Sequence, residues 1–220
     1  YVIMATKKGQ VKKTSLEQYS RPRSNGINAI TIKDGDVLLE AKLTTGQSQV
    51  VLAVKSGKAI RFEENKTRPM GRNASGVRGI RLANDADEVI GMVSVNDMDS
   101  DILVVSENGY GKRSKLEDYR MTNRGGKGVK TISITEKTGS LVSIKNVSDS
   151  YDLMIINRSG IAIRMVVESL RVMGRATQGV RLINLRDDDT IAAVAKVLKD
   201  DEDIEYVDDI EVDMTSETEK

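Results

Sequence analysis

The chain has 220 residues, of which 34 are Lys or Arg and 33 are Asp or Glu, so its formal net charge is +1. It contains no cysteine and no histidine, which excludes a disulfide framework, thiolate metal sites and the commonest general base. One Phe, six Tyr and no Trp leave few side chains for stacking on nucleic-acid bases. Without an apolar run of membrane-spanning length or a secretory signal, the sequence predicts a soluble cytoplasmic protein with no membrane partner.

A repeat of about fifty residues runs through the chain and is marked by two glycines. The first marker is a glycine in a polar turn, and it occurs at Gly9, Gly57, Gly109 and Gly160. The second is a glycine followed by Ile or Val, and it occurs at Gly26, Gly76, Gly128 and Gly179. The two markers stand 17, 19, 19 and 19 residues apart within the repeats. Such a fixed period is typical of stacked or radially arranged structural units.

Apolar runs on both sides of the first glycine predict a β-hairpin in every repeat. In chain order, these runs cover residues 2–6 with 11–14, 50–54 with 59–62, 102–106 with 111–114, and 153–157 with 161–167. The fourth repeat adds runs at 180–185 and 191–198, so each unit is expected to form a four-stranded antiparallel sheet. The predicted class is therefore all-β, with propeller-like blades over residues 1–49, 50–101, 102–152 and 153–199.

The last segment of the chain differs sharply in charge from the repeats. Residues 200–220 hold eleven acidic side chains and one lysine, which leaves 33 basic and 22 acidic residues in 1–199. A basic body with an acidic tail is the charge asymmetry of a polyanion-binding protein. We expect the tail to be disordered and to compete with the polyanion for the body, or else only to keep the protein soluble.

A basic residue recurs at three positions of the repeat. Four residues after the first glycine stand Lys13, Arg61, Arg113 and Arg164. Four residues before the second glycine stand Arg72, Arg124 and Arg175. Two residues after the second glycine stand Arg78, Lys130 and Arg181. Because equivalent positions of stacked repeats share one face, the pattern predicts a basic edge that binds the phosphate backbone of duplex nucleic acid.

Five further basic residues adjoin these positions or lie in the loop of the first repeat. The complete set of predicted DNA contacts is Lys12, Lys13, Arg21, Arg23, Arg61, Arg72, Arg78, Lys112, Arg113, Arg124, Lys127, Lys130, Arg164, Arg175 and Arg181. With few aromatic side chains available, this binding is expected to be independent of base sequence.

Several longer strings of residues are characteristic of one family. They are MATKKGQVKKT (4–14), GKAIRFEE (57–64), RPMGRNASGVRGIRL (68–82), ENGYGKRS (107–114), RGGKGV (124–129) and GRATQGVRLI (174–183). Together they resemble, over residues 1–199, the C-terminal domain of the bacterial DNA gyrase A subunit. The resemblance implies a β-pinwheel, a disc of four-stranded blades that exchange strands with their neighbours and wrap DNA around a basic outer edge.

The resemblance also implies what the chain does not do by itself. In that family, ATP-driven strand passage uses the gyrase B subunit together with a cleavage domain at the N-terminal side of the A subunit, in an A2B2 complex that binds ATP and Mg²⁺ elsewhere. We therefore expect no catalytic residue, metal site or cofactor in this chain. Its partners are expected to be double-stranded DNA and those two components. The related domain of topoisomerase IV is a close alternative.

Two features depart from the family pattern. The family usually has six blades, and this chain resembles the last four, so it is either part of a longer chain with two upstream repeats or a natural chain with fewer blades. The family's glycine-rich basic box normally lies in the first blade, and its counterpart here is the loop Arg124, Gly125, Gly126, Lys127 and Gly128. The missing box bears on full wrapping more than on simple DNA binding.

Two other classes of function remain alternatives. A propeller-like scaffold could bind acidic proteins through the same basic edge. An enzyme with a site on the propeller axis requires clustered carboxylates or lysines, and the acidic residues show no such registered clustering.

Overall fold

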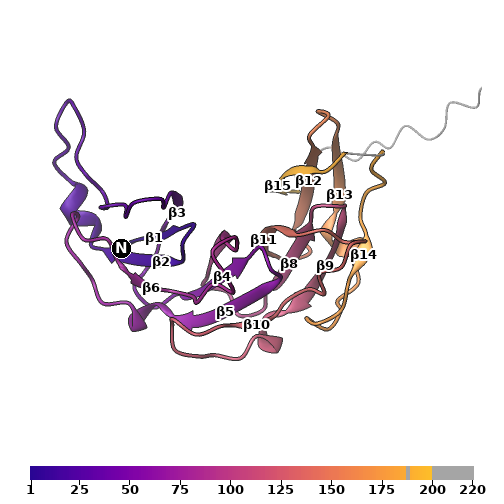
Figure 1. Cartoon of the computed structure of the whole chain (residues 1–220), viewed down its shortest axis with the longest axis horizontal. Helices are drawn as coiled ribbons and strands as arrows, with labels where there is room; N and C mark the ends of the chain where they lie inside the picture. The colour runs from indigo at the N-terminus through magenta and orange to yellow at the C-terminus, as the bar shows by residue number, and fades with distance from the viewer. Residues whose placement is uncertain (187–188, 200–220) are drawn as a thin grey trace, which may run out of the picture.

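The computed structural model describes residues 1–186 and 189–199, so the predicted acidic tail lies outside the described residues. Within them the chain forms β-strands and four short 3₁₀ turns, which confirms the predicted all-β class. The sheets follow one another along an arc, with the first repeat at one end and the fourth at the other (Figure 1). Among the described residues no helix is long and apolar enough to span a membrane.

Each repeat begins with the predicted hairpin. In the first repeat, β1 (Val2–Thr6) and β2 (Gln10–Thr14) pair in antiparallel fashion around a turn that Gly9 closes with a φ of +83°. Only glycine adopts this left-handed conformation at little cost, and here it matches the twist of the two strands. The hairpins of the other repeats are β4 (Gln49–Val54) with β5 (Lys58–Glu63), β8 (Asp101–Ser106) with β9 (Tyr110–Lys115), and β12 (Tyr151–Asn157) with β13 (Ala162–Val166).

The last long strand of each repeat pairs with the first strand of the same hairpin. These strands are β3 (Leu38–Leu43), β7 (Val89–Val95), β11 (Leu141–Val147) and β15 (Ile191–Leu198). Between the hairpin and this strand, each repeat makes one 3₁₀ turn: η1 (Leu16–Tyr19), η2 (Glu64–Lys66), η3 (Leu116–Asp118) and η4 (Val167–Ser169).

The fourth strand of each sheet comes from a later repeat. It is a two-residue strand directly after the second glycine: β6 (Val77–Arg78), β10 (Val129–Lys130) and β14 (Val180–Arg181). The resulting strand orders are β3-β1-β2-β6, β10-β5-β4-β7 and β11-β8-β9-β14. The four-stranded sheets are thus confirmed, but each is assembled from two consecutive repeats.

The sheet of the fourth repeat has three strands, in the order β13-β12-β15. The sequence predicted a fourth strand over residues 180–185 within this repeat, and that prediction is wrong. Only Val180–Arg181 is a strand, and it pairs with β9 of the third repeat. The outer edge of β13 therefore has no neighbouring strand among the described residues.

Apolar side chains from neighbouring repeats share each core. Between the second and third sheets, for example, Val51 of β4, Tyr119 and Ile132 are fully buried together. The Tyr119 hydroxyl is paired with Thr131 Oγ1 at 2.5 Å, which satisfies its polar atom in that core. The same packing continues between the first and second sheets and between the third and fourth. The repeats consequently fold against one another as one array.

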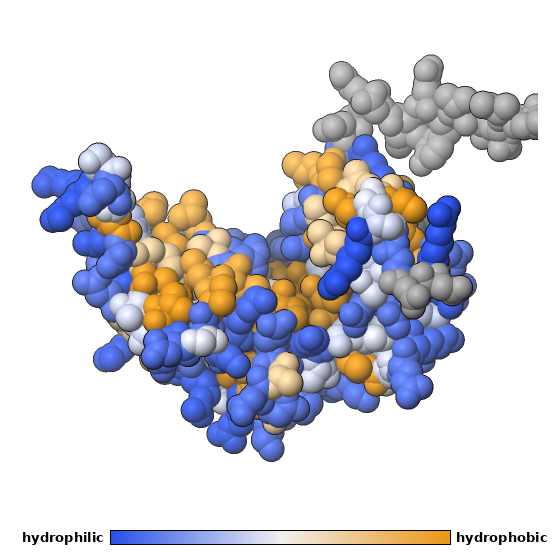
Figure 2. Space-filling model, turned by 45° about the horizontal axis from the view of Figure 1, so that its top comes forward, coloured by the Kyte–Doolittle hydropathy of each residue, from blue (hydrophilic) through white to orange (hydrophobic). Residues whose placement is uncertain are grey.

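The two sides of the arc differ in character. Strands β3, β11 and β15 line its concave side, whereas β6, β10 and β14 lie toward its convex side (Figure 1). Figure 2 shows hydrophobic residues gathered on the concave side and hydrophilic residues over the convex side. We call the convex side, formed by β6, β10, β14 and the loops that precede them, the outer edge.

Candidate nucleic-acid interface

The basic residue four positions after the first glycine holds consecutive repeats together. Arg61 donates from Nη1 to the carbonyl oxygens of Leu116 (2.8 Å) and Tyr119 (3.1 Å), at the two ends of η3 in the next repeat. Lys13 donates from Nζ to the carbonyl oxygen of Glu64 (3.2 Å), the first residue of η2. The carbonyl oxygens of Leu116 and Glu64 also accept the backbone N–H that closes each turn, so the basic side chain uses the second lone pair of the oxygen.

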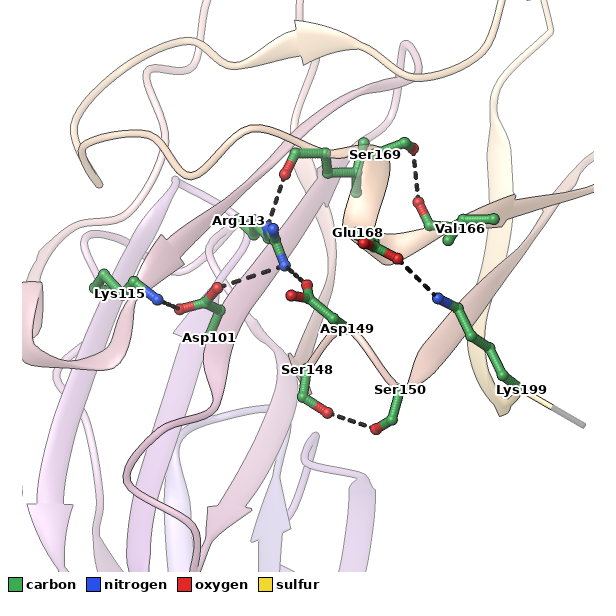
Figure 3. A network of polar contacts seen from close by, with 11 residues as sticks. Asp101, Arg113, Lys115, Ser148, Asp149, Ser150, Val166, Glu168, Ser169 and Lys199 are labelled. Atoms are coloured by element: carbon green, nitrogen blue, oxygen red, sulfur yellow. Dashed lines mark hydrogen bonds and ion pairs between the residues drawn. The ribbon is translucent and has the colours of Figure 1, made fainter. Parts of the chain in front are cut away.

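Arg113 is the corresponding residue of the third repeat, and it is the most completely enclosed arginine of this set (Figure 3). Its Nε donates to the carbonyl oxygen of Leu170 at 2.7 Å, directly after η4. Its Nη1 is paired with Asp149 and lies 3.7 Å from an oxygen of Asp101. The hydrogen bond from Arg113 lowers the pKa of Asp149 below its ordinary value.

Arg164 occupies the same position of the fourth repeat but has a different environment. It makes an ion pair of 2.7 Å with Asp152 of its own hairpin, and its side chain is 46% exposed. No η turn of a following repeat contacts it among the described residues. The inter-repeat contact of this position is therefore made three times.

Two lysines on the hairpins are also buried. Lys12 and Lys112 have no exposed surface, and Lys112 Nζ donates to the carbonyl oxygen of Gly174 at 2.5 Å. Lys12 Nζ donates to the carbonyl oxygen of Ala29 at 2.5 Å and is also bonded to that of Arg72. Burial lowers the pKa of Lys112 to about 8, and burial likewise lowers the pKa of Lys12.

This placement corrects part of the predicted DNA-contact set. Lys12, Lys13, Lys112 and Arg113 are at most 9% exposed, so their cationic groups are not at the surface where a phosphate would lie. Lys13 and Arg113 instead bind backbone carbonyl groups of the following repeat, Lys112 binds that of Gly174, and Lys12 binds those of Ala29 and Arg72.

The arginine four positions before the second glycine bridges two repeats at the outer edge. Arg175 donates from Nε to the carbonyl oxygen of Asp118 (3.0 Å) and from Nη1 to that of Lys130 (2.7 Å). Arg124 donates in the same way to Lys66 (2.9 Å) and Arg78 (3.1 Å). Arg72 donates to the carbonyl oxygen of Asn28 at 3.1 Å. These three arginines are half-buried, as is Arg61.

The basic residue two positions after the second glycine is exposed in all three repeats that carry it. Arg78, Lys130 and Arg181 are the second residues of β6, β10 and β14, the outermost strands of three consecutive sheets. Arg181 is oriented by Tyr110, whose hydroxyl oxygen accepts from Nη2 at 2.9 Å and from Nε at 3.2 Å. This hydrogen bonding lowers the pKa of Tyr110.

The box-like loop lies against the preceding repeat. Gly125 has a φ of +82°, and its N–H donates to the carbonyl oxygen of Gly79 at 2.6 Å. Gly128 has a φ of +70°, and a Cβ atom there would stand 2.5 Å from the carbonyl oxygen of Ala59. Glycine is needed at Gly128 for the close approach of the two backbones. The loop holds the exposed side chain of Lys127 at the outer edge.

Three exposed arginines of the outer edge were not predicted from the sequence. Arg68, Arg120 and Arg171 each follow the residue that caps a 3₁₀ turn, and each is exposed. They are separated by 52 and 51 residues, so the period of the glycines could have identified them. Arg21 and Arg23, which were predicted, are exposed in the loop of the first repeat.

The described residues include no α-helix that could enter a DNA groove, and their hairpins are strands within larger sheets. The four 3₁₀ turns are three or four residues long, whereas base reading in the major groove typically uses an α-helix or a β-ribbon. Registered cations on a curved edge are suited to a row of phosphates instead.

The strand-exchanged sheets and their basic outer edge define a propeller-type domain built from repeats. Residues 1–45, 49–96, 100–148 and 151–197 match the family described as DNA gyrase C-terminal domain, beta-propeller. The chain belongs to this family, as its resemblance to the β-pinwheel domain of gyrase A predicted.

Individual proteins support this assignment. The chain is 46% identical over 205 residues to the A subunit of DNA gyrase from Staphylococcus aureus (strain NCTC 8325 / PS 47), and the alignment covers 92% of this chain and 23% of that protein. It thus spans less than a quarter of that relative's length.

Two solved structures have the same fold. The C-terminal domain of DNA gyrase A superimposes with a TM-score of 0.80 at 26% identity, covering 90% of this chain and 66% of that one. The C-terminal domain of DNA topoisomerase IV superimposes with a TM-score of 0.85 at 24% identity, covering 90% and 62%. At that identity the second likeness concerns the fold alone.

Proposed function

We propose that this chain binds duplex DNA along its outer edge through phosphate contacts, without reading base sequence. The observation that carries the proposal is that the second residue of every two-residue outer strand is basic and exposed: Arg78, Lys130 and Arg181. Arg68, Arg120, Lys127 and Arg171 add exposed charges from the loops that precede these strands. If all seven neutralise a phosphate, the slope of log K against log salt is roughly −6.

The convex shape of the outer edge supports bending of the bound DNA (Figure 1). Bending a duplex of 20–30 base pairs costs roughly 1 to 6 kcal/mol, which several phosphate contacts offset. In this proposal, the DNA follows the outer edge from one sheet to the next and is wrapped with a fixed hand. Arg72, Arg124 and Arg175, which bridge the repeats, hold the edge in shape and add half-buried charges to it.

The parent enzyme in this proposal is DNA gyrase, with this chain as a non-catalytic DNA-wrapping domain of its A subunit. The 46% identity to the gyrase A protein of Staphylococcus aureus supports this assignment. Negative supercoiling with ATP and Mg²⁺ is then performed in the cytoplasm with the gyrase B subunit, together with the cleavage domain of the A subunit. The topoisomerase IV protein is the second candidate, because its C-terminal domain has the same fold.

Backbone binding is tested by the salt dependence of DNA affinity. Fluorescence anisotropy is measured on short duplexes of two unrelated sequences over a series of salt concentrations. We expect Lys130→Gln and Arg78→Gln each to weaken binding equally on both sequences and to reduce the slope by about one. Lys42→Gln removes the same charge from β3 on the concave side and is the matched control. A variant of the outer edge that changed sequence preference but left the slope unaltered would contradict the proposal.

Wrapping is tested separately by ligation of nicked circular DNA in the presence of the chain. A linking-number shift that scales with protein supports chiral wrapping and the gyrase assignment. Binding without any shift at the same salt concentration contradicts chiral wrapping by these four repeats and means that the missing repeats or box are needed for it.

A further inference from the structure

Each hairpin of the first three repeats contacts the repeat that follows it, and we call this contact a joint. At every joint, the basic residue of the outer strand lies directly opposite the hairpin residue that follows the turn glycine. The pairs are Arg78 with Gln10, Lys130 with Lys58, and Arg181 with Tyr110. Directly opposed residues of an antiparallel pair carry their side chains on the same face of the sheet, with Cβ atoms roughly 5 Å apart. The hairpin residue therefore forms part of the surroundings of each exposed cation.

At the third joint, the tyrosine holds its cation in place. Arg181 donates from Nε and Nη2 to the hydroxyl oxygen of Tyr110, and from Nη1 to Oδ1 of Asn184 at 3.3 Å. Tyr110 is itself only 6% exposed, so its ring is fixed by packing. A guanidinium group has five N–H groups, and these three bonds leave two of them for a further acceptor. Arg181 is thus oriented before any ligand binds.

Lys137 brings a second cation to the same tyrosine. Its Nζ lies 5.4 Å from the centroid of the Tyr110 ring, and the Cζ atom of Arg181 lies at the same distance. The loop that carries Lys137 is fixed by Asn108, whose Nδ2 donates to the carbonyl oxygens of Glu136 (3.1 Å) and Lys137 (3.3 Å). The hydrogen bonds from Arg181 lower the pKa of Tyr110, and the positive charges of Arg181 and Lys137 act in the same direction.

The two cations line a cleft of about 620 Å³ between the third and fourth repeats. Among residues 1–186 and 189–199, neither Lys137 nor Arg181 forms an ion pair with a carboxylate. Asp189 also lines the cleft, but its oxygens accept from Asn157 Nδ2 (2.6 Å) and Ser159 Oγ (2.7 Å). The cations of the described cleft are therefore available to an external anion.

This arrangement occurs at one joint because the third repeat differs from the others in one loop. In the first and second repeats, the N–H of the residue before the turn glycine donates to a carboxylate, that of Asp36 or Asp87. In the third repeat, the equivalent N–H donates to the carbonyl oxygen of Thr138 at 3.0 Å. Thr138 thus stands where those repeats have an aspartate, and Lys137 precedes it. The residues in the place of Lys137 in those repeats are Gly35 and Ala86.

We propose that Tyr110, Lys137 and Arg181 form a phosphate-binding site, in which one phosphodiester of the bound DNA lies in the cleft between the third and fourth repeats. The inference rests on the proposed function and adds two residues to it: Lys137 contacts the phosphate, and Tyr110 is a positioning residue for Arg181. A guanidinium fork matches the oxygens of a phosphate. Because Arg181 is already oriented, it loses less conformational freedom on binding than a free side chain does. DNA is therefore held most firmly at the third joint.

Lysine acetylation of the full chain, read by mass spectrometry, tests whether DNA covers Lys137. With a saturating duplex at low salt, Lys137 and Lys130 should both lose most of their reactivity, because a bound phosphate covers each ammonium group. Lys42 lies on β3 at the concave side and should keep its reactivity as the control. In a second arm, inorganic phosphate replaces the duplex at the same concentration of phosphate groups, and it should protect neither Lys137 nor Lys130.

A double-mutant cycle tests the role of Tyr110. Tyr110→Phe keeps the buried ring and removes the hydroxyl that holds Arg181. In fluorescence anisotropy we expect it to weaken duplex binding about threefold without changing the salt slope, because the arginine must then be ordered on binding but no charge is lost. In the Arg181→Gln chain the same substitution should have no further effect, since Tyr110 acts through Arg181. Lys137→Gln should reduce the slope by about one.

Three results would overturn this proposal and leave DNA binding by the outer edge intact. One is a complex in which Lys130 is protected but Lys137 stays reactive. Another is equal weakening by Tyr110→Phe with and without Arg181, which would make the tyrosine merely structural. The third is protection of Lys137 by inorganic phosphate as strong as that by DNA, which would assign the cleft to a free anion. If DNA protected neither Lys137 nor Lys130, the proposed function would itself be wrong.

Discussion

Substituting the basic residue four positions after the first glycine should destabilise the fold more in the second repeat than in the fourth. Replacing Arg61 by methionine removes a bond to Gln49 (2.7 Å) and the two bonds to the carbonyl groups of η3. Hydrogen bonds from a charged donor contribute roughly 1.5 to 3 kcal/mol each when buried, and less where water can replace the donor. Because Arg61 is half-buried, we expect Arg61→Met to lower the free energy of unfolding by about 3 kcal/mol.

Arg164→Met is the matched control, since it makes the same change at the equivalent position. This side chain makes one half-exposed ion pair, with Asp152, so its loss is expected to cost about 1 kcal/mol. Urea denaturation followed by circular dichroism, at micromolar concentration to keep the chain dilute, measures both. Equal destabilisation of the two variants would refute the role of Arg61 in the joint. A stable Arg61→Met protein whose DNA salt slope falls by one would identify Arg61 as a phosphate contact instead.

Other variants test the interior of the joints. The pKa of Lys112 is about 8 in the folded chain, against the ordinary value of 10.5 that is expected in the unfolded chain. Between these two pH values the unfolded state binds one more proton than the folded state. The free energy of unfolding therefore rises with pH, by roughly 3 kcal/mol. Lys112→Ile, which copies Ile60 of the second repeat, should abolish this rise in urea denaturation at a series of pH values, and a persisting rise would assign it elsewhere. Gly128→Ala should lower the free energy of unfolding by roughly 3 kcal/mol or more, because the added Cβ atom meets the carbonyl oxygen of Ala59. Gly26→Ala should lower it by about 1 kcal/mol, since only the positive φ opposes that change. Equal losses of stability would show that the close approach of Gly128 to the Ala59 backbone is unimportant. Arg175→Lys should cost about 1 kcal/mol, since one ammonium group replaces a guanidinium that binds two carbonyl groups, and an unchanged denaturation midpoint would contradict this.

Local features of the fold were predictable because they depend on neighbours in the sequence. The hairpins form where predicted, and Gly9, Gly57, Gly109 and Gly160 all adopt the positive φ that their turns require. The all-β class follows from the same runs of Val and Ile. The pairing partner of a two-residue strand was harder to predict, because residues 180–181 could pair with a strand of their own repeat or with a strand of the third repeat. Their pairing with β9 is decided by long-range packing.

The basic residues illustrate a second limit of sequence reasoning. Basic residues that recur at one position of the repeat indicate that each repeat binds a similar acceptor there. That acceptor can be a phosphate of a bound nucleic acid or a carbonyl group of the next repeat. Arg113 and Arg181 are both registered, yet the first is enclosed by Leu170, Asp101 and Asp149 and the second is exposed at the outer edge. Burial separates the two cases, and burial is a property of the assembled array.

The sequence by itself determined the period, the class of fold, the glycine turns and the excess of positive charge in residues 1–199, since these are properties of composition and short-range order. The tertiary structure alone decided which repeat completes each sheet and which cations face solvent. These depend on contacts between residues about fifty positions apart, where the geometry of strand pairing and close backbone packing selects among sequences that are locally alike.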